Sequence, residues 1–310
     1  MVGECFAALS ALCYSLADAS IVRGGPTKKG SSGVLLSSLL TAIISSMLWI
    51  SVGLPFGEFL DLPGKYAALG WFTLGGVLST GLARSMAFKA TEISGVANSA
   101  VHRRLIPAFS IVFSLIIFGS SVSNTEILGI TLIVFGVYSS AIGLAKTPAL
   151  EDRDRTFGIR QSANRGIMFG LFASVFYAGA YSARKLGMEA CPDPAFGAFV
   201  GSLSGMIWCY AQRRLGTSTG EMTEATGGGA SRWQFLAAAC VSLGQLLQFF
   251  ALRHTDMVIV ALIGSLEMLV GPLLSSIVFR QERSFGKGNI LAGLLSLAGL
   301  ALIAARALTD

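Results

Sequence analysis

Charged residues are scarce in this sequence. Asp, Glu, Lys and Arg make up 13% of the 310 residues, and hydrophobic residues make up 53%. A soluble domain has about 25% charged residues. The formal net charge is +6, but the basic residues lie mostly in short loops between apolar runs, so we expect no nucleic-acid partner. The composition predicts a multi-pass all-α membrane protein, because helices satisfy their own backbone hydrogen bonds in lipid.

Catalytic and metal-binding patterns are missing as well. The chain has only two histidines, no HExxH motif, no nucleophile elbow and no Walker motif. Its five cysteines show no CxxC spacing and lie mostly inside apolar segments, where they act as small packing residues. We therefore expect a protein that is not an enzyme, with no catalytic residues, no metal, no cofactor and no ATPase of its own.

Long apolar runs are abundant, and each is long enough to cross a bilayer, for which about 20 residues are needed. They predict ten transmembrane helices. The runs are 3–22, 33–54, 66–88, 93–118, 126–145, 166–184, 195–212, 233–252, 257–279 and 288–306.

Residues 146–165 form the most charged segment and separate two similar halves, 1–145 and 166–310. AFKATE at 87–92 resembles ALRHTD at 251–256, and Pro107 corresponds to Pro272. Each half has five predicted helices, an odd number, so the two repeats are expected to have opposite orientations in the membrane. The segment 146–165 is predicted to be an extramembrane linker.

Loop charges predict the sidedness. Fifteen Lys and Arg fall on the side that holds the linker, and five, including Arg184 and Lys185, fall on the other side. The positive-inside rule then places the linker in the cytoplasm and both termini outside.

These features resemble the EamA repeat of the drug/metabolite transporter superfamily. The resemblance covers nearly the whole chain. It rests on the short turns AFKATE and ALRHTD, the proline-containing helix after each, and last helices rich in small residues, as in GITLIVFGV and AGLLSLAGL. A glutamate typical of the family after the proline-containing helix is present as Glu282, whereas the first half has Ser120 and Ser121 there. The resemblance implies ten helices in two inverted five-helix repeats around a central cavity, and a transporter of small molecules.

The fourth predicted helix carries His102, Arg103 and Arg104 near mid-membrane, where charges are costly and normally functional. Aligning the two prolines sets His102 opposite Glu267. An arginine there could bind the carboxylate or phosphate of a substrate, with Glu267 or His102 as a proton carrier. The alternative is a fixed ion pair between Glu267 and one arginine, with the second arginine reaching the headgroups.

Other polar residues within the apolar runs are weaker candidates. Arg84 either snorkels to the headgroups or lines the cavity. Asp18 is either a cavity acid or a partner of Arg23. Gln245 and Gln248 share a helix face and must find partners inside the bundle, either another helix or the substrate.

Small and aromatic residues complete the set. Tyr14, Tyr177 and Tyr181 lie in the opening helices of the two halves, where they either line the cavity or pack, and Tyr14 and Tyr177 occupy matching places. Glycines at 197, 201 and 205 form a spaced ridge that predicts close helix packing.

We therefore expect a secondary-active transporter of a small anionic or zwitterionic metabolite, with the lipid bilayer and a small-molecule substrate as partners. Proton coupling through Glu267 or His102 is one option. Alternatives are export of neutral or cationic compounds by way of Glu267, and a non-transporting membrane scaffold. A monomer or homodimer in the plasma (inner) membrane is expected.

Overall fold

The structure of the chain is a computed structural model. It describes residues 2–24, 32–87, 89–90, 93, 105–119, 124–145, 153–214, 232–267, 270–271, 274, 294–295, 298–299 and 301–302. All regular secondary structure within these residues is helical. The elements are α1 (Val2–Gly24), α2 (Ser32–Val52), α3 (Phe56–Asp61), α4 (Lys65–Gly76), the π-helix η1 (Val77–Ala83), α6 (Ile106–Phe118), α7 (Asn124–Ala145), α8 (Arg153–Ala190), α9 (Pro194–Arg214), α10 (Arg232–His254) and α11 (Met257–Gly264).

The helices follow the predicted apolar runs closely. α1, α2, α9 and α10 match their runs to within a few residues, and α4 with η1 matches the third run. Among the described residues, four stretches are long and apolar enough to cross a membrane, namely Val2–Ile21, Leu35–Val52, Lys65–Ala87 and Arg232–His254. Most of the last two predicted runs lies outside the described residues.

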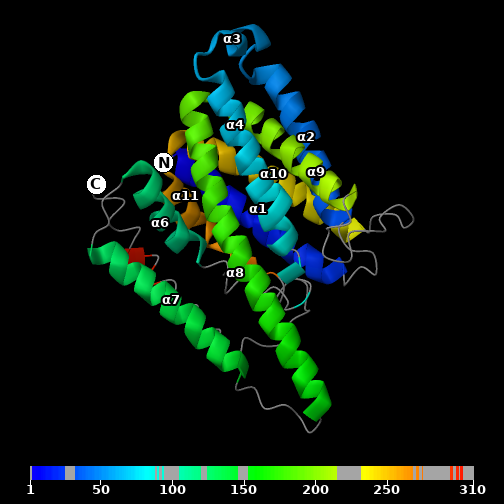
Figure 1. The fold of residues 1–310 in the computed structure, drawn as a ribbon, viewed down its shortest axis with the longest axis vertical. Helices are drawn as coiled ribbons and strands as arrows, with labels where there is room; N and C mark the ends of the chain where they lie inside the picture. The colour runs from blue at the N-terminus through cyan, green and yellow to red at the C-terminus, as the bar shows by residue number, and fades with distance from the viewer. Residues whose placement is uncertain are drawn as a thin grey trace.

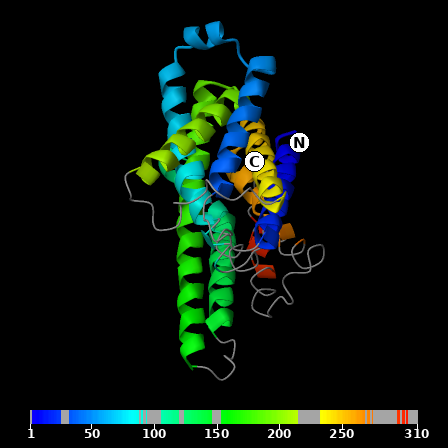
Figure 2. The ribbon, with the colours of Figure 1, turned by 90° about the vertical axis from the view of Figure 1, so that its right-hand side faces the viewer.

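The structure extends the sixth predicted helix at both ends. α8 has 38 residues, about 57 Å at 1.5 Å per residue, whereas the hydrocarbon layer is about 30 Å thick. It includes residues 153–165 of the predicted linker and continues six residues past the predicted end at Arg184. The prediction that this helix ends at residue 184 is therefore wrong. In Figures 1 and 2 the N-terminal part of α8 extends beyond the bundle, beside part of α7.

Helices of one half pack mainly on helices of the other. α1 lies along α10, and α8, its counterpart in the second half, lies along α4 and η1. α2 packs on α9 and α10, while α9 also packs on α4; α1 contacts α11, as α8 contacts α6. Each of these contacts has a counterpart in which the corresponding helices of the two halves change places, because the two halves have the same order of helices. Among the described helices, the two halves therefore interlock, and most contacts join one half to the other.

Small residues let α4 and α9 cross at close range. A Cβ atom built at Gly76 would lie 2.0 Å from the carbonyl oxygen of Gly201, which no side chain could tolerate. A Cβ built at Gly205 would lie 2.5 Å from Cβ of Thr80. The packing role predicted for this glycine ridge of α9 is confirmed.

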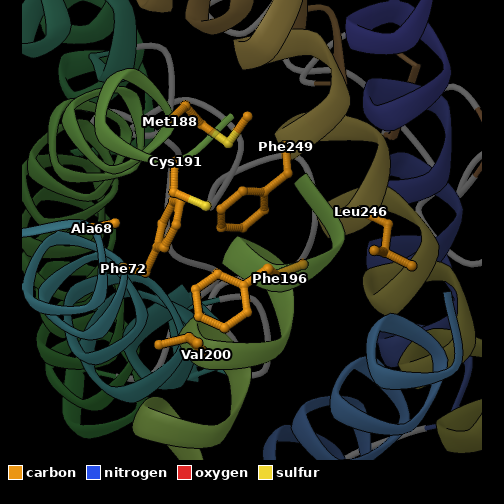
Figure 3. Close-up of a cluster of buried hydrophobic side chains, with 9 residues drawn as sticks. Ala68, Phe72, Met188, Cys191, Phe196, Val200, Leu246 and Phe249 are labelled. Carbon is orange, nitrogen blue, oxygen red and sulfur yellow. The ribbon is translucent and has the colours of Figure 1, made fainter. Parts of the chain in front are cut away.

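Aromatic side chains fill the end of the bundle that carries α3. Phe72 of α4 packs against both Phe196 of α9 and Phe249 of α10, with a ring-centroid distance of 6.1 Å in each pair. Trp49 of α2 lies 5.1 Å from Phe196. Figure 3 shows the three phenylalanines gathered with the buried Cys191, which follows α8 directly. We call Trp49, Phe72, Cys191, Phe196 and Phe249 together the aromatic cluster.

A buried aspartate ties the two halves together at the same end. Asp193 is 3% exposed. Its Oδ1 accepts hydrogen bonds from the backbone N–H groups of Ala195 and Phe196, at 2.9 and 3.0 Å, which caps the N-terminus of α9. Its Oδ2 accepts from the N–H of Leu54, in the first half, at 2.8 Å.

Candidate functional site

Arg84 follows η1 directly, and its side chain points into the bundle with 3% exposed. One Nη donates a hydrogen bond to Oγ of Ser37 at 3.1 Å, and the other donates to the amide oxygen of Gln245. Ser37 lies on α2 and Gln245 on α10, so this guanidinium joins three helices from both halves. Snorkelling to the lipid headgroups does not occur in this structure.

The π-helix before Arg84 changes the hydrogen bonding of the chain locally. Thr80 Oγ1 in η1 is buried without a hydrogen-bond partner in the described part of the chain, whereas Ser85 just beyond donates to the carbonyl oxygen of Gly81 at 2.9 Å. π-helical turns are rare and are found frequently at functional sites, and they change the direction of the side chains that follow. We infer that η1 sets the direction of Arg84.

Arg184 approaches the same place from α8. It is 2% exposed. One Nη donates to the amide oxygen of Gln248, and the other donates to Oγ of Ser79 in η1. Its Cζ lies 4.8 Å from the ring centroid of Phe249, so the guanidinium also borders the aromatic cluster.

Gln245 and Gln248 hold the two arginines because they lie three residues apart on one face of α10. Both amides are buried. Gln248 Nε2 in turn donates to the hydroxyl of Tyr181 at 2.6 Å. We call Arg84, Arg184, Gln245, Gln248 and Tyr181 the buried arginine centre.

Two positive charges, those of Arg84 and Arg184, lie together in the buried arginine centre. Within the part of the chain that the structure describes, no carboxylate lies within ion-pair distance of either guanidinium. The charges of Arg84 and Arg184 repel each other, and the tyrosines at 14, 177 and 181 are close enough to interact electrostatically with Arg184. By contrast, the neighbouring Lys185 lies 3.8 Å from the exposed Asp256.

Hydrogen-bond donors also exceed acceptors in the centre. Arg184 Nε and Gln245 Nε2 are both buried, and neither has a partner among the described residues. Leaving such a group unsatisfied costs about 1–3 kcal/mol. The arrangement therefore favours an added group that accepts hydrogen bonds and carries negative charge.

The structure brings several predicted site residues to this centre. Arg84, Gln245 and Gln248 belong to it. Tyr14 packs on α10 at Gly244, and the side chain of Tyr177 is half-buried nearby.

Of the two predicted acids, Glu267 lies near this centre. Glu267 interacts electrostatically with Tyr14 and Tyr181, and its backbone carbonyl accepts a hydrogen bond from Ser15 at 3.2 Å. Asp18 is buried on α1. His102, Arg103 and Arg104 lie outside the described residues.

Arg184 is the member of the centre that the sequence analysis missed, because the pair Arg184–Lys185 looked like the end of a helix. A signal was present. The residues that follow, LGMEAC, remain mostly small or apolar up to Pro192, which stops the helix. The charge pair therefore lies inside the helix, one turn or more before its end. Without Arg184 the side opposite the linker has even fewer basic loop residues, so the predicted sidedness of the membrane does not change.

No metal site emerges from these residues. In the described ranges, no group of three or more His, Cys, Asp or Glu side chains could hold a metal ion.

A bundle of interlocking halves with long apolar helices defines a multi-pass helical membrane protein. The EamA-like transporter family model matches residues 1–142 and 164–305. The chain belongs to this family, and so it is a membrane transporter of the drug/metabolite type with a small-molecule substrate.

Comparison with solved structures supports the fold alone. One structure, described only as "Crystal structure of protein", aligns with a TM-score of 0.62 and 16% sequence identity, over 98% of this chain and 97% of that chain. No curated protein matches the sequence.

Proposed function

We propose that the chain is a secondary-active transporter that moves a small anionic or zwitterionic metabolite by alternating access. The acidic group of the substrate binds at the buried arginine centre. The observation that carries this proposal is the burial of Arg84 and Arg184 without a carboxylate in ion-pair distance among the described residues. A buried charge without an ionic partner is costly, and a bound anion offsets that cost.

Alternating access fits the position of this centre between the halves. Arg84 of the first half bonds Gln245 of the second, and Arg184 of the second half bonds Ser79 of the first. Any movement of one half against the other must change these bonds. The aromatic cluster packs between the centre and α3, so in this proposal the substrate would have to enter from the opposite side.

Glu267 serves as a counter-charge or proton carrier in this proposal. It interacts electrostatically with Tyr181 of the centre and with Tyr14, which packs against α10 beside the centre. The predicted part of Arg103 and Arg104 in holding the substrate concerns residues that the structure does not describe, and it stays a prediction. So do the plasma (inner) membrane and the monomeric or homodimeric state.

A thermal-shift screen of the purified protein in detergent tests the proposal. The panel contains small anions, zwitterions, cations and neutral compounds at equal ionic strength. A ligand at 100 times its dissociation constant stabilises the native state by about 2.7 kcal/mol, which is measurable. We expect anions or zwitterions to stabilise the wild type and Lys185→Gln but not Arg184→Gln. Lys185→Gln is the matched control, since it removes the adjacent positive charge.

The other outcomes separate the alternatives. Stabilisation by cations or neutral compounds alone, lost in Glu267→Gln, would replace the proposal by export through Glu267. A well-folded protein that no compound stabilises would favour the non-transporting scaffold. A changed pH dependence of anion binding in Glu267→Gln would support its role as proton carrier.

A further inference from the structure

The two glutamines fix the spacing of the two guanidiniums. Gln245 and Gln248 are three residues apart on α10, and side chains at this spacing have Cβ atoms about 5–6 Å apart. Each glutamine accepts a hydrogen bond from one arginine. The two positive charges therefore lie along the same face of α10, close enough to interact electrostatically.

The charge of the centre is greater than one bound carboxylate would neutralise. Arg84 and Arg184 each contribute one positive charge, since guanidinium stays protonated in proteins. Among the described residues, no carboxylate lies within ion-pair distance of either guanidinium. A ligand with a single negative charge would therefore pair directly with only one of the two arginines.

The hydrogen bonds of the centre show how such a ligand could enter. The amide oxygens of Gln245 and Gln248 are neutral acceptors, and hydrogen bonds to an ionised acceptor are about twice as strong. Arg184 Nε and Gln245 Nε2 are buried donors that still lack acceptors among the described residues. Anionic oxygens can therefore replace the amide oxygens on the guanidiniums and also satisfy these donors.

We propose that the substrate is a small anion with two negative charges, one held by each guanidinium, which exchange their glutamine oxygens for oxygens of the anion. This inference rests on the proposed function and narrows its substrate class. A short dicarboxylate supplies two acidic groups at about the required spacing. A phosphate monoester supplies both charges on one group. Both share the chemistry that the centre selects.

Binding assays on the full chain in detergent test this inference. The probes are malonate, succinate and glutarate as dicarboxylates, acetate and propionate as monocarboxylates, and methyl phosphate. All are compared at constant ionic strength and at pH 8, where the dicarboxylates and methyl phosphate are doubly ionised. We expect the best divalent anion to bind at least about tenfold more tightly than any monovalent anion, the factor that corresponds to about 1.4 kcal/mol. A preference for a dicarboxylate would indicate two separate acidic groups, and a preference for methyl phosphate would indicate both charges on one group.

Variants of the centre provide the decisive comparison. Arg84→Gln and Arg184→Gln should each abolish the preference for divalent anions, while Lys185→Gln should retain it. Gln245→Glu adds a negative charge beside Arg84 and should shift the preference toward monovalent anions. Gln245→Leu, which adds no charge, is its control. If an arginine variant fails to fold, the comparison of Gln245→Glu with Gln245→Leu still tests whether the charge of the centre sets the preference for divalent anions.

The results distinguish this inference from the proposed function. Equal binding of monovalent and divalent anions, lost in Arg184→Gln, would overturn the divalent substrate and leave anion transport standing. A divalent preference that Arg84→Gln and Gln245→Glu leave unchanged would also overturn it. A folded wild type that binds none of the anions would contradict both.

Discussion

Arg84 of the first half donates a hydrogen bond to the amide oxygen of Gln245 of the second half, 161 positions away in the sequence. Both side chains are buried, and Arg84 bonds Ser37 as well. The bond joins α10 to the segment that follows η1. It therefore ties the stability of the interlocked halves to the candidate site itself.

Removing this acceptor should destabilise the protein. Gln245→Leu leaves the guanidinium of Arg84 without one of its two acceptors, and an unsatisfied buried donor costs about 1–3 kcal/mol, more when it is charged. We expect a lower thermal midpoint in detergent. Leu243→Ala, on the exposed face of the same helix, is the control and should have little effect. An unchanged midpoint in Gln245→Leu would show that water or another group replaces the amide oxygen.

The crossing of α4 and α9 should not tolerate a methyl group. Gly76→Ala would place its Cβ against the carbonyl oxygen of Gly201, and overpacking of this kind costs about 1–3 kcal/mol. Gly70→Ala in the same helix is the control, because a Cβ there meets no atom within 4 Å. Thermal unfolding should show a loss for Gly76→Ala only. Equal midpoints would mean that the two helices are further apart than the structure shows.

Loss of the Asp193 carboxylate should loosen the α3 end of the bundle. Asp193→Ala removes the N-cap of α9, worth about 0.5–2 kcal/mol, and leaves the N–H of Leu54 without its acceptor. Asp193→Asn should have an intermediate effect, since it keeps one amide oxygen. Asp61→Ala, an exposed aspartate on α3, is the control. The comparison of thermal midpoints would go against this account if Asp61→Ala were as costly.

The thiol of Cys191 should react slowly in the folded protein. Burial raises the pKa of Cys191, so at neutral pH little of the reactive thiolate is present, and the aromatic cluster covers the sulfur. A chain that retains Cys191 as its single cysteine should be alkylated by a maleimide far more slowly when folded than when unfolded in detergent. The rate should rise with pH, and Phe196→Ala should increase it. Equal rates in folded and unfolded protein would place Cys191 at an accessible surface.

The fold was largely predictable because lipid imposes simple rules on sequence. Apolar runs of about 20 residues mark spanning helices, and the matching turns AFKATE and ALRHTD mark the two repeats. α8 was harder to delimit. The charges between 153 and 165 resemble a linker, yet the structure continues the helix through them. Charge and helix formation are compatible outside the hydrocarbon layer, so hydropathy alone does not locate the start of this helix.

The site was only partly predictable for a different reason. Gln245 and Gln248 were recognisable because buried amides in a membrane need partners. Which partners they have depends on the crossing of α4, α8 and α10 and on the π-helix before Arg84, and no local pattern encodes these. Arg184 is fully buried beside Lys185, which is half-buried and pairs with the exposed Asp256, so two similar neighbours have different environments.

Transport by reconstituted protein tests the central claim most directly. Uptake of the anion that binds best is measured in proteoliposomes that contain equal amounts of folded wild type, Arg184→Gln or Lys185→Gln. The account predicts that Lys185→Gln transports at a rate close to that of the wild type and that Arg184→Gln loses transport by at least about tenfold, since a charged hydrogen bond is worth about 1.5–3 kcal/mol. Undiminished transport by folded Arg184→Gln would contradict a substrate site at the buried arginine centre.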